Sequence, residues 1–198
     1  MQTLSFLSWL VPGVALVLAG GCARKPEGLT AYIPTNAVAA AYVDLDLVQT
    51  TALYARLPVP EDLRDASAVL VVFDGKDWGM AVQRKTGITT TGVAAPKNGG
   101  ADLLQRATLN APAWLVTRGG VTWPLPGNLM NVNLLLHQAE YVSAALHGND
   151  IEATAQCGSA DAARHLEGNI RALASLARFD GLDVKSEGST VRIRAKLP

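Results

Sequence analysis

The chain has 198 residues, of which 49% are hydrophobic, and its 17 basic and 17 acidic side chains give a net charge of zero. A chain of this length forms one domain, or two small halves that share a core. Nucleic-acid binding requires a basic surface, so a neutral chain leads us to expect no nucleic-acid partner.

The first residues have the pattern of an export signal. An apolar run from Leu4 to Ala19 contains no charged residue and is interrupted by Pro12 and Gly13. A helix that spans a bilayer needs roughly 20 apolar residues, so this shorter run is more typical of a cleaved signal. We therefore predict that residues 1–21 form a signal peptide.

The segment Ala19-Gly20-Gly21-Cys22 resembles the lipobox of bacterial lipoproteins, with Leu18 one place further back. In that family the cysteine sulfur carries a diacylglycerol, and cleavage leaves the cysteine as the first residue. The resemblance implies a lipid at Cys22, a tether over 22–30 and attachment to a membrane of the cell envelope. Ala23 replaces the aspartate that retains such proteins at the inner membrane, which favours the outer membrane, facing the periplasm. A plain signal peptide with an incidental cysteine and an uncleaved amphipathic anchor remain as alternatives.

The first half of the domain alternates short elements. Residues 38–45 predict a strand, and Asp46 with Gln49 forms a capping box for a helix over 47–57. A hairpin follows, with strands at 67–73 and 78–84 and turn residues at 74–77. We then expect a loop over 86–100, a helix over 101–107 and a strand over 113–118.

The second half begins with a loop over 121–127. Asn128 or Asn131 is then expected to cap a long helix that reaches about Leu146. A strand is predicted over 151–157, and Ser159 caps a second long helix whose apolar residues keep helical spacing to Ala177. A hairpin over 182–186 and 190–197 ends the chain.

These elements predict a single α+β domain over 31–198. Its sheet is expected to be rich in antiparallel pairs and covered by helices on one side. The order of elements indicates two ferredoxin-like halves of βαββαβ type, about 31–118 and 119–198. The two-half pattern loosely resembles that of uncharacterised envelope lipoproteins.

Three groups of residues suggest chemistry, and for each we prefer a structural role. Asp44-Leu45-Asp46 resembles the DxD motif of glycosyltransferases, whose carboxylates hold a divalent cation, but alternation places both on a polar strand face and Asp46 serves as a helix cap. His137 and Glu140 have the spacing of two metal ligands on a helix, without a second such pair. Residues 96–100 are rich in glycine and precede a helix, but they lack the spacing of a phosphate-binding loop.

The last strand is basic on one face, because Arg192, Arg194 and Lys196 alternate with apolar residues. This face is our candidate for binding an anion or a lipid headgroup, while a solvated face that discourages edge pairing is the alternative. Cys157 shares the apolar face of its strand, so we predict a buried thiol. Trp78, Trp114 and Trp123 are expected in the core unless they form an exposed binding surface.

The sequence favours a non-catalytic envelope protein that is anchored by lipid at Cys22 and binds a protein partner or stabilises an assembly. We expect no catalytic residue, no metal and no cofactor. One alternative is an envelope hydrolase or transferase that uses His137 and Glu140 or Asp44. Another is a carrier of a small hydrophobic ligand or lipid, with a cavity between sheet and helices lined by small residues: Ala39, Ala40, Ala41, Ala153 and Ala155.

Overall fold

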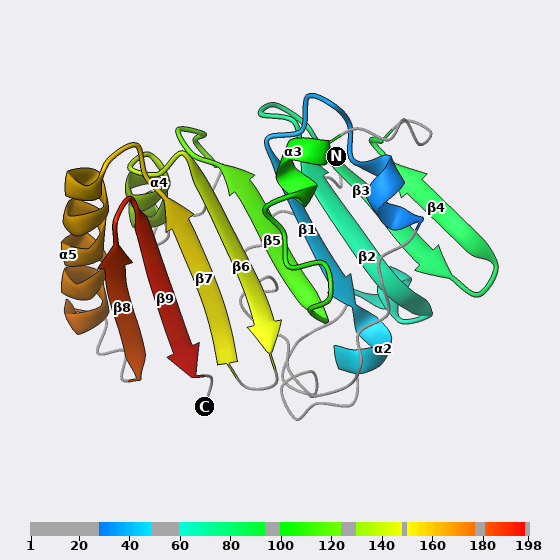
Figure 1. The fold of residues 1–198 in the computed structure, drawn as a ribbon. Helices are drawn as coiled ribbons and strands as arrows, with labels where there is room; N and C mark the ends of the chain where they lie inside the picture. The colour runs from blue at the N-terminus through cyan, green and yellow to red at the C-terminus, as the bar shows by residue number, and fades with distance from the viewer. Residues whose placement is uncertain are drawn as a thin grey trace.

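The computed structural model describes residues 28–48, 60–93, 100–123, 130–147, 150–176 and 181–196. They form a nine-stranded sheet with the strand order β4-β3-β2-β1-β5-β6-β7-β9-β8 (Figure 1). Each of its neighbouring strand pairs is antiparallel. The α+β class and the antiparallel sheet are therefore confirmed. The two ferredoxin-like halves are not confirmed, because the described strands include no parallel pair of the kind that a βαβ crossover produces.

Most strands that follow one another in the chain are also neighbours in the sheet. The bounds of the first five are β1 (Ala39–Asp44), β2 (Ala66–Phe73), β3 (Trp78–Arg84), β4 (Gly87–Thr91) and β5 (Ala113–Arg118). The other four are β6 (Tyr141–His147), β7 (Asp150–Gln156), β8 (Leu182–Glu187) and β9 (Thr190–Lys196). The helices are η1 (Leu29–Tyr32), α2 (Leu45–Val48), η3 (Glu61–Leu63), α3 (Ala101–Leu104), α4 (Met130–Leu136) and α5 (Ala160–Leu176).

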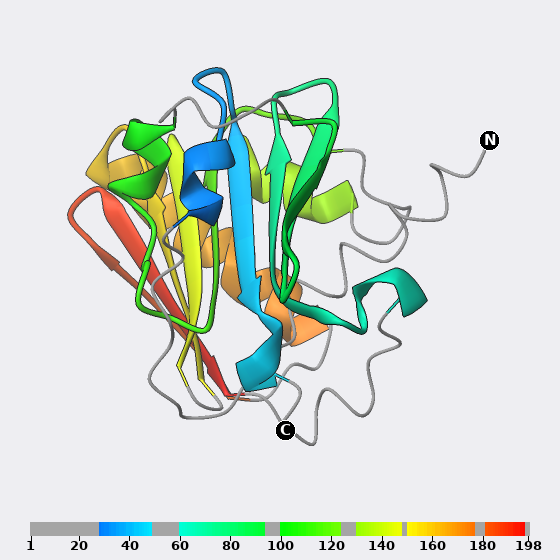
Figure 2. The same ribbon diagram turned by 90° about the vertical axis from the view of Figure 1, so that its right-hand side faces the viewer.

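The two faces of the sheet bury different sets of side chains, because successive residues of a strand point to opposite faces. The α3 face carries Tyr42 and Trp114, which pack with Leu103 of α3 and with η1 in one core cluster. The α5 face carries Val184 and Val191 at its C-terminal end, where they pack under α5. Figure 2 shows η1 and α3 on one side of the sheet and α4 on the other. The prediction that helices cover one side only is therefore wrong.

The prediction of a long helix that reaches Leu146 is also wrong. Among the described residues of that range only α4 is helical, and after a turn over 137–140 the chain continues as β6. Both faces of β6 are covered: Ala145 packs on the α3 face, whereas Val142 packs on the α5 face. A strand that buries apolar residues on both faces shows no alternation, so the sequence pattern did not distinguish it from a helix.

Two smaller predictions in the first half are corrected. The segment predicted as the loop 86–100 contains β4, an edge strand of threonines that are mostly exposed and so leave no alternating signal. Asp44, not Asp46, caps α2, since the Asp44 carboxylate accepts the N–H of Leu47 at 3.2 Å. Gln49 and the remainder of the predicted helix lie outside the described residues, and α3 is shorter than predicted.

The hairpin of β2 and β3, the helix α5 and the closing hairpin of β8 and β9 are confirmed. In the first hairpin, the carboxylate of Asp74 accepts the backbone N–H groups of Lys76 and Asp77 at 2.9 and 2.7 Å. At the start of α5, the hydroxyl of Ser159 accepts the N–H of Ala162 at 3.1 Å, as a helix cap does. The predicted signal peptide and Cys22 lie outside the described residues.

Candidate ligand cavity

The middle of the α5 face contains a cavity of about 420 Å³. Helix α5 packs on β8 and β9, so it does not cover the central strands β1, β5 and β6. Small side chains leave space on this part of the sheet. Ala41 lies between Val71 and Leu115 in the register, and the small residue Ala144 lies beside Leu115. The volume is within the range of roughly 300–1,000 Å³ that is usual for small-molecule sites.

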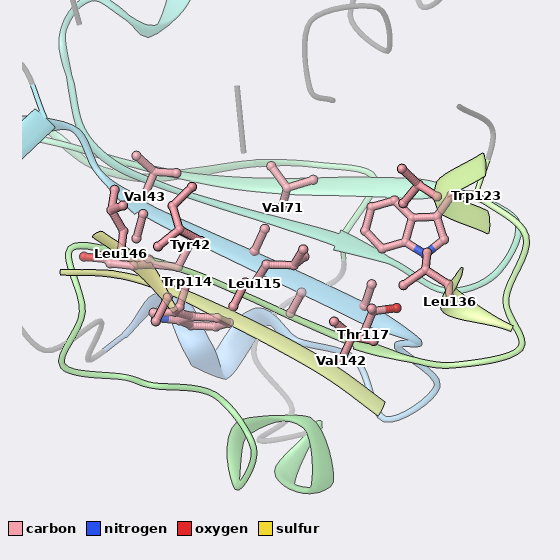
Figure 3. A pocket seen from close by; sticks show the side chains of 18 of the residues that line it. Tyr42, Val43, Val71, Trp114, Leu115, Thr117, Trp123, Leu136, Val142 and Leu146 are labelled. Atoms are coloured by element: carbon pink, nitrogen blue, oxygen red, sulfur yellow. The ribbon is translucent and has the colours of Figure 1, made fainter. Parts of the chain in front are cut away.

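The described residues that line the cavity come from β1, β2, β3, β5, β6, β7, α4 and the segment before α4 (Figure 3). On the α5 face they are Ala39, Ala41, Val43, Val71, Trp78, Ala113, Leu115, Thr117, Trp123, Val132, Leu136, Val142, Ala144, Leu146 and Ile151. The lining also includes Ala40, Tyr42, Trp114 and Ala145, whose side chains belong to the core of the α3 face.

At one end of the cavity, the lining residues Trp78 and Trp123 cluster with the buried ring of Phe73. The ring of Phe73 stacks on Trp78 with a centroid distance of 4.6 Å. Trp123 meets Trp78 edge to face at 5.6 Å and lies 6.2 Å from Phe73. Offset and edge-to-face contacts of this kind stabilise aromatic clusters beyond their buried area. This aromatic end therefore forms a preformed apolar wall.

A buried asparagine of α4 fixes the position of Trp123. The side-chain oxygen of Asn133 accepts the backbone N–H of Trp123 at 2.9 Å, and its amide group donates to the backbone carbonyl of Trp123 at 2.9 Å. The hydroxyl of Thr122 lies 3.2 Å from the Nε2 atom of His137, which joins the same two segments. These bonds hold Thr122 and Trp123 against α4 and the residues that follow it, so Trp123, Val132 and Leu136 border one side of the cavity.

The cavity is apolar in the part that the structure describes. None of the described lining residues has a charged side chain. The hydroxyl of Thr117 donates to the backbone carbonyl of Arg118 at 2.9 Å and lies 3.3 Å from that of Val38, so its proton is already engaged. Burying an unpaired charge here would be costly, which favours an uncharged ligand.

The small residues predicted to line a cavity divide between two environments. Ala39, Ala40 and Ala41 do line it. Ala155 instead packs beneath α5, in the same cluster as Leu166, and neither Ala153 nor Ala155 borders the cavity. The sequence indicated small residues but could not indicate which strands α5 would leave uncovered.

The residues considered for metal binding do not come together. Asp44 ends β1 and is buried, whereas Asp46 lies in α2 and is exposed, so the two carboxylates do not share one strand face. His137 and Glu140 both follow the last residue of α4, so they are not neighbours on a helix. Within the described ranges, no three His, Cys, Asp or Glu side chains converge on a point that could hold a metal.

The basic residues of β9 lie on the α3 face and have acidic neighbours. Arg194 pairs with Glu152 of β7 at 3.2 Å, and Arg192 pairs with Glu187 of β8 at 3.5 Å. Lys196 stands opposite Asp150 in the register. These pairs offset the positive charge that the sequence of β9 alone suggested, and the headgroup role of this strand stays a prediction.

Cys157 and Trp114 lie in the core, as the sequence predicted, whereas Trp78 and Trp123 do not. Cys157 is buried in the cluster beneath α5, and burial together with the nearby Glu140 carboxylate raises the pKa of its thiol. Trp114 stacks on Tyr42 in the core of the α3 face. Trp78 and Trp123 belong to the cavity wall. No periodicity in the sequence could separate these two tryptophans from Trp114. Of the segment 96–100, only Gly100 lies within the described residues.

Comparison with protein-family models, with curated proteins and with solved structures finds no match to this chain. Among the described residues, no helix is both long and apolar enough to cross a membrane.

Proposed function

We propose that this chain is a lipid-anchored protein of the bacterial envelope whose domain binds a small uncharged hydrophobic molecule or lipid without catalysing a reaction. The observation that carries the proposal is the cavity of about 420 Å³ on the α5 face, together with the apolar character of its described lining. A volume of this size and an aromatic wall suit one apolar chain or ring system. A carrier needs such a site and no reactive group.

Photolabelling tests the binding role. The full chain is reconstituted in phospholipid vesicles and irradiated with a long-chain alkane that carries a diazirine, and the labelled peptides are mapped by mass spectrometry. We expect labels on peptides that contain Leu115, Leu136 or Val142 and none on the outward side of α5. Labelling spread evenly over the outer surface, or unchanged by excess unlabelled alkane, would contradict a specific site.

The anchor is proposed from the sequence alone. The uncharged apolar run and the lipobox at Cys22 support export and lipidation. Expression of the native chain beside Cys22→Ala in a bacterium, followed by cell fractionation and intact mass measurement, tests it. We expect loss of residues 1–21, an added diacyl mass and membrane recovery for the native chain only. Equal processing and solubility of both chains would show that Cys22 is incidental.

Binding of an envelope protein partner is the second candidate function. It is favoured by α4, where Val132 and Leu134 are 39% and 64% exposed, the two large hydrophobic side chains that are exposed among the described residues. Apolar side chains on a surface helix are typical of contact sites. A photocrosslinker at position 134 in living cells tests this function: one recurrent adduct supports it, and adducts with lipid alone contradict it.

A further inference from the structure

Two hydrogen-bond donors at the aromatic end of the cavity have no acceptor within the described part of the chain. The indole nitrogens of Trp78 and Trp123 are buried, and neither has a hydrogen-bond partner among the described residues. An indole N–H can only donate. Buried N–H groups are almost always paired in folded proteins, so an unpaired one calls for a physical reason.

The two donors belong to the same part of the site. Both side chains line the cavity, and their rings meet edge to face at a centroid distance of 5.6 Å. Asn133 bonds the backbone of Trp123 but does not reach its indole nitrogen. In Figure 3 this nitrogen lies on the side of the ring that faces Leu136. A ligand that enters beside Leu136 and shifts the edge of the Trp123 ring would bring an acceptor to the indole nitrogen.

The rest of the lining restricts the chemistry of that acceptor. A carboxylate or phosphate would enter without a counter-ion, because no cationic side chain is among the described lining residues. A hydroxyl headgroup would bring a donor that neither indole can accept and that would need the oxygen of Thr117, the one side-chain hydroxyl among the described lining residues of the α5 face. A carbonyl oxygen that only accepts matches the two free indole donors best.

We propose, on the basis of the proposed function, that the cavity takes a neutral long-chain ester. Its carbonyl oxygen accepts a hydrogen bond from the indole of Trp78 or Trp123. Its hydrocarbon chain lies on the small residues Ala41 and Ala144 of the central strands, where apolar surface is removed from water.

Competition in the photolabelling assay tests this ligand class. The full chain in vesicles is labelled with the diazirine alkane in the presence of hexadecane, methyl palmitate or palmitate, each at the same mole fraction of lipid. We expect methyl palmitate to compete about tenfold better than hexadecane, which corresponds to one hydrogen bond gained in an apolar site. Palmitate, which carries a charge, competes least.

Phenylalanine variants isolate the donors, because they keep an aromatic ring and remove the N–H. The double variant Trp78→Phe with Trp123→Phe should bring the ester-to-alkane ratio close to one. Tyr141→Phe is the control: it also removes one donor from an aromatic side chain, but Tyr141 packs against the core of the α3 face and is not among the described residues that line the cavity. It should leave the ratio unchanged.

A second readout needs no substitution. When methyl palmitate is added, the indole N–H resonance of Trp78 or Trp123 in the NMR spectrum should shift downfield. If hexadecane competes as well as the ester and no indole resonance moves, the ester proposal is overturned while the proposed binding function stands. If no competitor reduces the labelling, the binding function itself fails.

Discussion

A larger side chain in the cavity should make the protein more stable, which is the opposite of what the same substitution does in a packed core. Ala41 lies in the central strand β1, 8% exposed, with its side chain on the α5 face between Val71 and Leu115. The substitution Ala41→Leu adds three carbons that point into the cavity. Because Ala41 lines the cavity, we expect these carbons to enter space that no described side chain fills.

The magnitude follows from the area that the new side chain buries. Each buried methylene contributes about 0.8 kcal/mol, so three contribute about 2.4 kcal/mol. Ordering a leucine side chain costs about 0.5–1 kcal/mol of conformational entropy. We therefore expect the free energy of unfolding to rise by about 1–2 kcal/mol and the Tm to rise by about 2–4 °C for each kcal/mol.

Ala68 supplies a matched control, because it has the same exposed fraction of 8% but packs in the core of the α3 face. Ala68→Leu inserts the same carbons where no space exists and should lower stability by about 1–3 kcal/mol. Urea denaturation of both variants, followed by near-ultraviolet circular dichroism, measures the two changes. A loss of stability in Ala41→Leu equal to that in Ala68→Leu would refute the cavity.

Three further predictions concern other parts of the site and its support. Asn133→Ala removes both bonds to the backbone of Trp123, so we expect a loss of about 1–3 kcal/mol in urea denaturation and weaker photolabelling of the cavity. Glu167 has a lowered pKa because the hydroxyl and the N–H of Ser186 donate to it. The contribution of this carboxylate to the free energy of unfolding is therefore full above its ordinary pKa of 4.5. It is lost as the pH falls through the lowered pKa. The stability difference between the native chain and Glu167→Gln should accordingly shrink in acid, and a constant difference would contradict the assignment. The buried Cys157 thiol, with its raised pKa, should react with a thiol reagent only at the rate of unfolding, as peptide mapping after timed labelling can test.

Local signals in the sequence predicted much of the fold. The turn residue Asp74 and the cap Ser159 act through bonds to their own neighbours, so their roles are readable from a few positions. The closing hairpin has clean alternation because only one face of β9 is buried, with Val191 and Ala195 inside and Arg192 and Arg194 outside. Such elements need no knowledge of distant contacts.

The parts that the sequence did not predict depend on long-range packing. Strand β6 looked helical because both of its faces are covered, by segments far away in the chain. The cavity exists because α5 covers β8 and β9 and leaves β1 exposed to the space beside α4. The role of Asn133 likewise depends on a contact across ten residues with Trp123, and an asparagine within a helix gives no sign of it.

Native mass spectrometry of the full chain with methyl palmitate tests the central claim most directly. We expect the native chain and Ala68→Leu to gain the mass of one ligand, and Ala41→Leu, whose leucine occupies the part of the cavity where the hydrocarbon chain is proposed to lie, to bind markedly less. Equal binding by all three chains would place the ligand elsewhere, and no binding by the native chain would contradict a ligand site for this ester between the sheet and α4.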